Sequence, residues 1–221
     1  MILHLYALTD EPVDLAGGRG IDDAPLTAIE TGGLHAVVTD HATAPAARRP
    51  AAVRHAAVVE VLARDRRALP VRFGVHHDRR ALVAALDASA DRLRRLLDQV
   101  AGRREYAVRA SEAAAEPPLQ PAPSARSGRA YLQQRLQDLQ ATDARRASQR
   151  QQLEDATAEL VGLADQERFR QGPAGLERCF LVLPANAPAF ERAAARLREP
   201  ATELVVTGPW PPYSFADGAM S

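Results

Sequence analysis

The sequence predicts an α+β fold arranged as two domains. Short apolar segments of strand length alternate with longer segments of helical periodicity, without the regular strand–helix–strand repeat of a parallel sheet. A stretch rich in Ala and Pro between residues 112 and 127 interrupts this pattern. We therefore expect an N-terminal α+β domain over residues 1–111, a linker over 112–127, and a C-terminal domain with a sheet and a long helix over 128–221.

The first domain begins with apolar segments bounded by turn residues. We expect strands at residues 2–8, 26–30, 34–39 and 71–74, the second and third joined by a Gly-Gly turn, and a helix over 51–68 that Pro70 ends. A second helix follows Asp78, whose carboxylate is a good N-cap. Its apolar face consists of Leu82, Leu86, Leu93 and Leu97. Gly102 ends this helix, and residues 105–109 are expected to form a strand with Tyr106 and Val108 on one side.

The second domain is expected to start with a long helix over residues 129–170. Three leucines at helical spacing, Leu132, Leu136 and Leu139, open an apolar stripe, and Leu153 and Leu160 resume it. Residues 143–152 between them are almost wholly polar, which predicts exposure to solvent or a break. The interrupted stripe argues against a coiled-coil scaffold built on this helix. A buried strand at 179–183, a helix at 189–198 and a strand at 202–207 should complete the domain.

Charge and hydropathy narrow the function classes. The chain has 28 basic and 28 acidic residues, so it lacks the basic excess typical of nucleic-acid-binding proteins. No apolar run approaches the roughly 20 residues that cross a bilayer, and the N-terminus lacks the pattern of a signal peptide. We expect a cytoplasmic protein that binds neither nucleic acid nor membrane. The single cysteine, Cys179, lies in an apolar run and is expected to be a small buried side chain.

The chain shows no recognisable catalytic motif. His76-His77-Asp78 is the main cluster of potential metal ligands, but neighbouring residues of a strand point to opposite faces. The segment Gly17-Gly18-Arg19-Gly20 is similar to a phosphate-binding loop without the later spacing, and no GxxxxGK[ST], HExxH or GxSxG motif is present. We therefore expect no catalytic residues, no metal and no cofactor.

The segment Gly208-Pro209-Trp210-Pro211-Pro212-Tyr213-Ser214-Phe215 is the most distinctive part of the chain. Its three prolines fix φ and remove backbone donors, so neither helix nor central strand is expected. We predict a stiff, extended rod that presents Trp210, Tyr213 and Phe215. This rod is either a clasp in which Trp210 and Phe215 pack across the domain junction, or a rigid surface for a partner.

This C-terminal segment resembles the GPWPPYSF signature of the gas vesicle protein L/F family. The segment Leu69–Gly74 is similar to that family's LPVRFG sequence, and Ser127–Leu132, which contains Tyr131, is similar to the start of its long helix. The resemblance spans nearly the whole chain. It implies a ferredoxin-like variant for the first domain and an accessory or minor structural protein of gas vesicle assembly, without enzymatic activity.

The resemblance also implies the partners: the hydrophobic gas vesicle shell protein and other gas vesicle accessory proteins. The residues that could bind a partner or form the structural signature are Arg72, Phe73, Tyr131, Trp210, Pro211, Pro212, Tyr213 and Phe215. Arg72 is either the outward residue of a central strand, with Val71 and Phe73 inward and Gly74 needed for close packing, or the border of a groove for a partner's backbone or carboxylate. The arginines of residues 143–152 are either solvated or a docking site for acidic segments.

An alternative from another functional class stays open at this point. A small-molecule enzyme or ligand-binding domain on a ferredoxin-like scaffold would need a pocket lined by several titratable groups with shifted pKa values.

Overall fold

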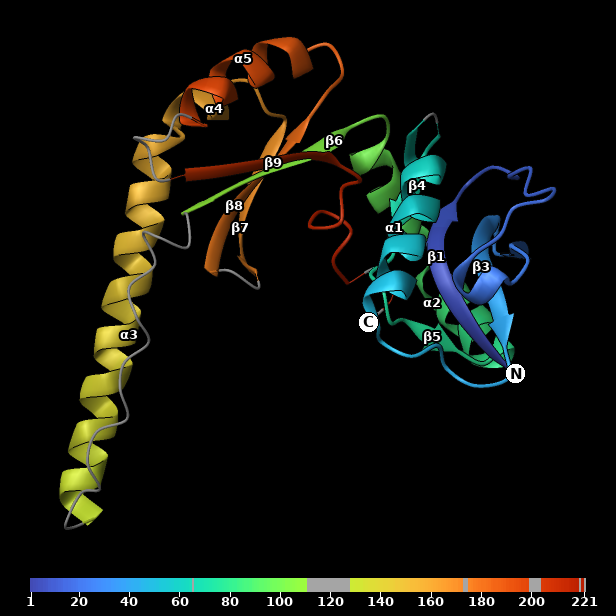
Figure 1. The fold of residues 1–221 in the computed structure, drawn as a ribbon, viewed down its shortest axis with the longest axis horizontal. Helices are drawn as coiled ribbons and strands as arrows, with labels where there is room; N and C mark the ends of the chain where they lie inside the picture. Colours follow the sequence, from blue (N-terminus) through green and yellow to red (C-terminus); the bar gives the residue numbers. More distant parts are fainter. Residues whose placement is uncertain (65, 111–127, 173–174, 199–203, 219, 221) are drawn as a thin grey trace. The chain divides into compact units, whose positions relative to one another are not determined.

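The structure, a computed structural model, describes residues 1–221 except 65, 111–127, 173–174, 199–203, 219 and 221 (Figure 1). The expected linker at 112–127 lies outside the described residues. The chain forms two compact units, and each is assembled from separate segments. The first unit comprises 1–105, 181–185 and 208–221, and the second comprises 106–180 and 186–207. This division differs from the one expected from sequence, because the C-terminal segment belongs with the first unit.

The first unit contains an antiparallel sheet centred on the first strand. Its strands are β1 (Ile2–Thr9), β2 (Thr27–Thr31), β3 (Leu34–His41), β4 (Ala68–Pro70) and β5 (His76–His77), in the order β2-β3-β1-β4 with β5 also paired to β1. The expected β2–β3 hairpin is confirmed, with both turn glycines at positive φ. Residues Leu3 to Thr9 of β1 are buried, which indicates that both faces of the sheet are covered there.

Two helices, α1 (Arg49–Arg64) and α2 (Arg79–Val100), pack on this sheet (Figure 1), and a short 3₁₀ turn, η1 (Ile21–Asp23), precedes β2. The start of α2 is as expected, since the carboxylate of Asp78 accepts a hydrogen bond from the Ala81 N–H at 2.8 Å. The expected apolar face is also confirmed, because its four leucines are fully buried. Helix α2 therefore owes its place to an apolar stripe that the sequence shows directly.

The segment after α1 differs from the expectation. The helix ends at Arg64 rather than 68, and the strand is Ala68–Pro70, while residues 71–74 are irregular. Pro70 is compatible with β4 because β4 ends the β2-β3-β1-β4 order, where a missing donor is tolerated. Gly74 adopts φ +96°, and a Cβ there would meet nothing within 4 Å. Gly74 is thus needed for a left-handed backbone conformation, not for the close packing that we expected.

The second unit is built on an antiparallel four-stranded sheet. Its strands are β6 (Arg104–Ala110), β7 (Gln166–Gly172), β8 (Gly175–Val182) and β9 (Leu204–Trp210), in the order β7-β8-β6-β9, with helices α4 (Ala158–Val161) and α5 (Ala187–Leu197). The start of β6 at 104–105, the end of β8 at 181–182 and the end of β9 at 208–210 belong to the first unit. Its core includes Tyr106, Phe180 and Phe190. The ring centroid of Phe190 lies 4.7 Å from that of Tyr106 and 5.5 Å from that of Phe180. Cys179 is buried, as expected.

The long helix is shorter than expected. Helix α3 covers Gly128–Ala156, and the sequence QERFRQG at 166–172 forms strand β7 instead of a helical end. This strand is at an edge of its sheet and is largely exposed, so it carries charged side chains instead of the apolar alternation that identifies a half-buried strand. The expectation that the polar middle of α3 lies in solvent is confirmed.

Candidate functional site

Two segments that are distant in sequence meet in the first unit. The segment Leu69–Gly74 and the C-terminal segment beginning at Gly208 both contribute to one cavity of about 240 Å³. Its lining includes Val71, Arg72, Tyr213, Ala216 and Asp217. The structure therefore joins two of the three sequence signatures into a single place in the fold.

The C-terminal segment is folded back, and the prediction of an extended rod is wrong. Residues up to Trp210 belong to the edge strand β9, and residues 213–218 form turns. Within these turns the carbonyl of Pro212 accepts from the N–H groups of Phe215 and Ala216, each at 3.1 Å. The lost proline donors predict an extended segment, but prolines keep their carbonyl acceptors, and the carbonyl of Pro212 closes the turn.

The C-terminal turn is fastened from inside by Glu105 of β6. The carboxylate of Glu105 is buried and accepts from the N–H of Ser214 at 2.7 Å and from its hydroxyl at 2.6 Å. Hydrogen bonds to a charged acceptor are the strong class in proteins. Sequence reasoning missed Glu105, because a lone acidic residue beside a buried aromatic in a strand is normally the outward-facing one.

Two arginines hold the outer side of the same turn. Arg72 donates to the carboxylate of Asp217 at 2.8 and 2.9 Å, and both side chains are about half exposed. Arg104 donates to the carboxylate of Glu60 at 2.7 Å and to the carbonyl of Pro209 at 3.2 Å. Arg72 thus points outward, as expected for the outward residue of a strand. It also binds a carboxylate, as expected for the border of a groove, but this carboxylate belongs to the same chain and not to a partner.

The other predicted site residues differ in accessibility. Pro211, Pro212 and Phe215 are buried in the turn, and Phe73 and Tyr213 are partly buried against the core around α1. Two predicted residues present large apolar surfaces to solvent, namely Trp210 at 52% exposure and Tyr131 at 61%. Tyr131 belongs to α3 in the second unit, whereas the other predicted site residues belong to the first unit.

Three hydrogen-bonded histidines, two buried and one partly buried, lie beside this cavity between β1, α1 and β5. The Nε2–H of His55 donates to the carbonyl of Val71 at 2.9 Å, so a neutral His55 has only Nδ1 free as an acceptor. His4 Nε2–H then donates to that Nδ1 at 2.8 Å, and His4 Nδ1 accepts from His76 Nε2–H at 3.0 Å. The Val71 carbonyl therefore fixes which ring donates and which accepts in each hydrogen bond between these histidines.

Burial disfavours the charged form of these rings. It lowers the pKa of His4 to about 3, helped by the neighbouring histidines, and that of His55 to about 4, opposed by the Val71 carbonyl. The pKa of His76 is also lowered, chiefly by burial. His4 and His55 are therefore neutral near pH 7 and act as hydrogen-bonding core residues.

A neighbouring network involves Tyr6, whose phenol oxygen accepts from the Ile21 N–H at 2.8 Å and lies 3.2 Å from the Thr39 hydroxyl. A Cβ on Gly20 would lie 2.2 Å from that phenol oxygen, so only glycine fits there. In the described part of the chain, no three His, Cys, Asp or Glu side chains are grouped so that they could hold a metal ion. Among the described helices, none is both long and apolar enough to cross a membrane.

Comparison with known proteins identifies the family. The family model described as gas vesicle synthesis protein GvpL/GvpF matches residues 2–217. The chain belongs to the GvpL/GvpF family. One curated relative, gas vesicle protein L of Streptomyces sp. (strain CB03234), is 30% identical over 245 residues that cover 96% of this chain and 92% of the relative.

Solved GvpF structures share the fold of this GvpL/GvpF chain. The crystal structure of GvpF from Anabaena sp. PCC7120 superimposes with a TM-score of 0.64 at 20% identity, and that of GvpF from Microcystis aeruginosa with a TM-score of 0.68 at 16% identity. Each match covers 97% of this chain and 98% of the other chain. The predicted combination of α and β structure is thereby supported over the whole length of the chain.

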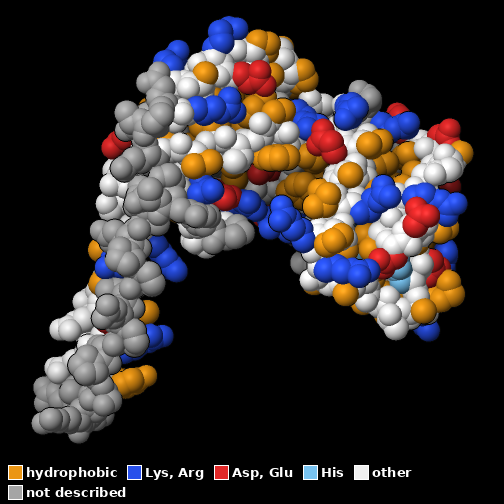
Figure 2. Space-filling view, in the orientation of Figure 1, with side chains coloured by type: hydrophobic (Ala, Val, Ile, Leu, Met, Phe, Trp, Pro, Cys, Tyr) orange, Lys and Arg blue, Asp and Glu red, His pale blue; other side chains and the backbone are white. Residues whose placement is uncertain are grey.

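Helix α3 carries the largest exposed apolar side chains of the second unit. Leu132, Leu136 and Leu139 are 67%, 56% and 49% exposed, and Tyr131 precedes them. The three leucines follow at spacings of four and three residues, so they lie on one face of the helix. Figure 2 shows hydrophobic side chains at the surface along this helix beside basic ones. The GvpL/GvpF chain thus presents a narrow apolar stripe on an otherwise polar helix.

Proposed function

We propose that this chain is an accessory protein of gas vesicle assembly that binds the hydrophobic shell protein and other vesicle proteins in the cytoplasm. By covering apolar surface before the shell forms, it would aid nucleation and prevent aggregation. Membership of the GvpL/GvpF family supports a role in gas vesicle assembly. The exposed leucine stripe of α3 is the single observation that supports the mode of action.

The stripe is costly for a protein that works alone. Contiguous exposed apolar side chains on a polar helix are typical of surfaces that bind a partner. Since neither Leu132, Leu136 nor Leu139 is buried within the chain, their apolar area is available to a partner. An apolar helix face of this kind binds by packing against another apolar surface, with anchors at spacings of three and four residues.

The other end of α3 is anchored. Leu153 and Leu160 are buried in the second unit, and the guanidinium of Arg178 donates to the Thr157 hydroxyl at 2.8 Å. Arg150 pairs with Glu154 at 2.9 Å and lies 4.2 Å from the centre of the Phe169 ring. Arg150 is therefore used within the unit, which argues against a docking role for it. The helix has a fixed C-terminal end and an apolar stripe nearer its start, which suits a rigid binding element.

The test is co-expression of this chain with the gas vesicle shell protein. Wild-type protein should raise the soluble fraction of the shell protein and be recovered in complex with it. The triple variant Leu132→Ser, Leu136→Ser, Leu139→Ser should lose most of this effect, because it removes the apolar contact while changing only exposed positions.

The matched control shifts the substitutions by one residue. The variant Gln133→Ser, Gln137→Ser, Gln140→Ser changes positions about 100° around the same helix and should behave as wild type. If both triple variants protect the shell protein equally well, the stripe is not the binding surface. If wild-type protein neither solubilises nor retains the shell protein, the proposed function is wrong.

The alternative of a small-molecule enzyme finds less support in the described residues. The cavity at the C-terminal turn is lined by a group with a clearly shifted pKa. That group is Tyr213, whose pKa is raised by burial and by the negative charges of Glu60 and Glu105. A phenol held in its protonated form is a poor general base, so the cavity does not favour catalysis.

A further inference from the structure

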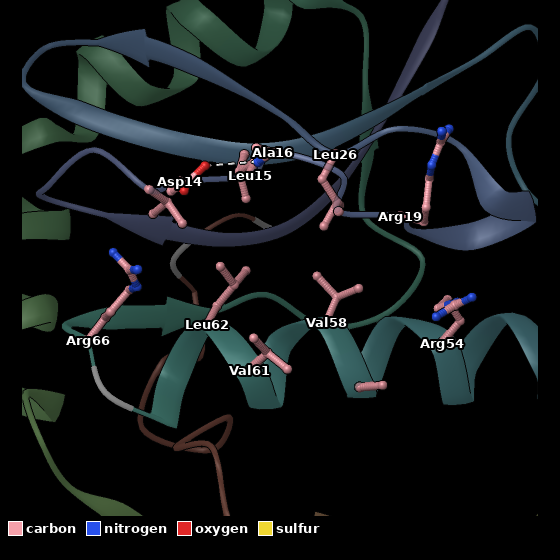
Figure 3. Close-up of a pocket in the computed structure, with 13 residues that line it drawn as sticks. Asp14, Leu15, Ala16, Arg19, Leu26, Arg54, Val58, Val61, Leu62 and Arg66 are labelled. Atoms are coloured by element: carbon pink, nitrogen blue, oxygen red, sulfur yellow. Dashed lines mark hydrogen bonds between the residues drawn. The ribbon is translucent and has the colours of Figure 1, made fainter.

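A second surface, on the first unit, has the composition of a binding groove. A cavity of about 300 Å³ lies between α1 and the segment from Val13 to Leu26. Figure 3 shows Leu15 and Leu26 directed toward the helix, and Val58 and Leu62 directed back toward them. The volume is within the range of ligand-binding pockets in proteins, and its floor is aliphatic.

The rim of this groove is positively charged. Three arginines line it, Arg19, Arg54 and Arg66, against one carboxylate, Asp14. The Asp14 carboxylate already accepts a hydrogen bond from the Ala16 N–H at 3.0 Å. Arg54 and Arg66 are exposed and form no ion pair with the described residues. The groove therefore carries two guanidinium groups for which the described part of the chain supplies no carboxylate.

The positions of these arginines limit what the groove can accept. Figure 3 shows Arg54 and Arg66 at opposite ends of the cavity. Arg54 lies within α1, which ends at Arg64, about 15 Å from Arg54 along the helix axis. Arg66 follows two residues after this end. A fatty acid carries one carboxylate and would pair with one end only. A ligand that pairs with both ends needs negative charges separated by about the same distance, with aliphatic groups between them.

We propose that this groove binds an acidic amphipathic helix of a partner protein, with aliphatic side chains between α1 and the Val13–Leu26 segment and carboxylates on Arg54 and Arg66. Guanidinium–carboxylate pairs give both orientation and affinity. Val61, at the groove and 66% exposed, extends the apolar surface. This proposal goes beyond the role of α3, because it concerns another unit and requires charge, so either one can fail without the other.

The test uses a fluorescent peptide of about 16 residues with one leucine face and glutamates at both ends. Fluorescence anisotropy measures its binding to the full-length protein. A twin peptide with each glutamate replaced by glutamine should bind at least about tenfold more weakly, because it loses the charged hydrogen bonds. Binding of the acidic peptide should also weaken as salt is added.

Two pairs of variants locate the site. Arg54→Glu with Arg66→Glu should weaken binding at least about tenfold, whereas Arg79→Glu with Arg80→Glu, which changes the net charge equally at the exposed start of α2, should not. Val61→Glu should weaken binding, and Val53→Glu, which is similarly exposed on the same helix but outside the cavity, should not. All these positions are exposed, so folding can be verified by circular dichroism.

Several outcomes would overturn the proposal. Equal affinity for the two peptides, or equal weakening by the groove and control variants, would show that Arg54 and Arg66 do not select acidic helices. No binding of the acidic peptide would have the same consequence. If oleate or vesicles containing phosphatidylserine bind with the same arginine dependence while the peptide does not, the groove serves a lipid and the proposal is wrong.

Discussion

The hydrogen-bonded histidines show how a few side chains can set the pH range in which the first unit is stable. His4, His55 and His76 form a hydrogen-bonded chain whose direction depends on neutral rings. A proton added to His55 would put a donor where the chain requires an acceptor. The hydrogen bonds between these histidines should therefore persist at neutral pH and break in acid.

This arrangement predicts a pH dependence of stability. The pKa of His4 in the folded protein is about 3 and that of His55 about 4, both below the ordinary value of 6.5. The unfolded chain thus binds more protons in acid, so stability is complete above about pH 6.5 and is lost as the pH falls toward the folded values. By about pH 5 the free energy of unfolding should fall by about 2 kcal/mol for each of the two histidines.

Urea unfolding between pH 7.5 and 5 measures this effect. The double variant His4→Phe, His55→Phe supplies the comparison, since it removes both titrating rings and should unfold with a flatter pH profile even if its stability is lower. Equal pH profiles for the variant and the wild-type protein would show that these histidines are not the acid-sensitive groups.

Glu105 gives a second prediction at the scale of single residues. In Glu105→Gln the amide nitrogen replaces one oxygen, so one of the two donors of Ser214 loses its acceptor. The free energy of unfolding should fall by about 1–3 kcal/mol, the cost of a buried unsatisfied donor. The exposed Glu11→Gln should change it little. Unchanged stability of Glu105→Gln in urea would show that the carboxylate does not fasten the turn.

At the scale of elements, the sequence is most informative where one physical cause decides the structure. Helix α2 could be predicted from its Asp78 cap and its leucine face, because local and tertiary preferences agree. Strand β7 could not, because an exposed edge strand needs no apolar pattern. The sequence does not locate strand β4, because a proline such as Pro70 can end a helix but is also accommodated in an edge strand.

The cap of α2 provides a prediction at this scale. Replacing Asp78 by Ala leaves the Ala81 N–H without its side-chain acceptor. The free energy of unfolding should fall by about 1 kcal/mol, as for other N-caps, while Asp78→Asn should be close to wild type. Urea unfolding of the three proteins distinguishes these outcomes, and full stability of Asp78→Ala would contradict the role of the cap.

At the scale of the whole molecule, the candidate site was partly predictable. The sequence showed that Arg72 and the segment around Phe215 are distinctive, and the structure places them beside one cavity. The folding back of the C-terminal segment onto the first unit depends on Glu105 and on proline carbonyls, whose partners are distant in sequence. Periodicity and spacing cannot report such contacts.

The surfaces left exposed on the two units suggest a division of work. The turn at Ser214 forms hydrogen bonds within the chain, whereas the leucines of α3 are exposed and available to a partner. In this account the C-terminal segment of prolines and aromatic residues stabilises the fold, and α3 supplies the apolar contact. Loss of the stripe should therefore impair vesicle assembly without lowering the stability of the chain.

The most direct measurement counts gas vesicles in cells that express the full set of vesicle genes except the one for this chain. The account predicts few or no vesicles by electron microscopy, recovery with wild-type protein, and poor recovery with the variant Leu132→Ser, Leu136→Ser, Leu139→Ser although that variant is folded and abundant. Normal vesicles in cells that lack this chain would contradict the account.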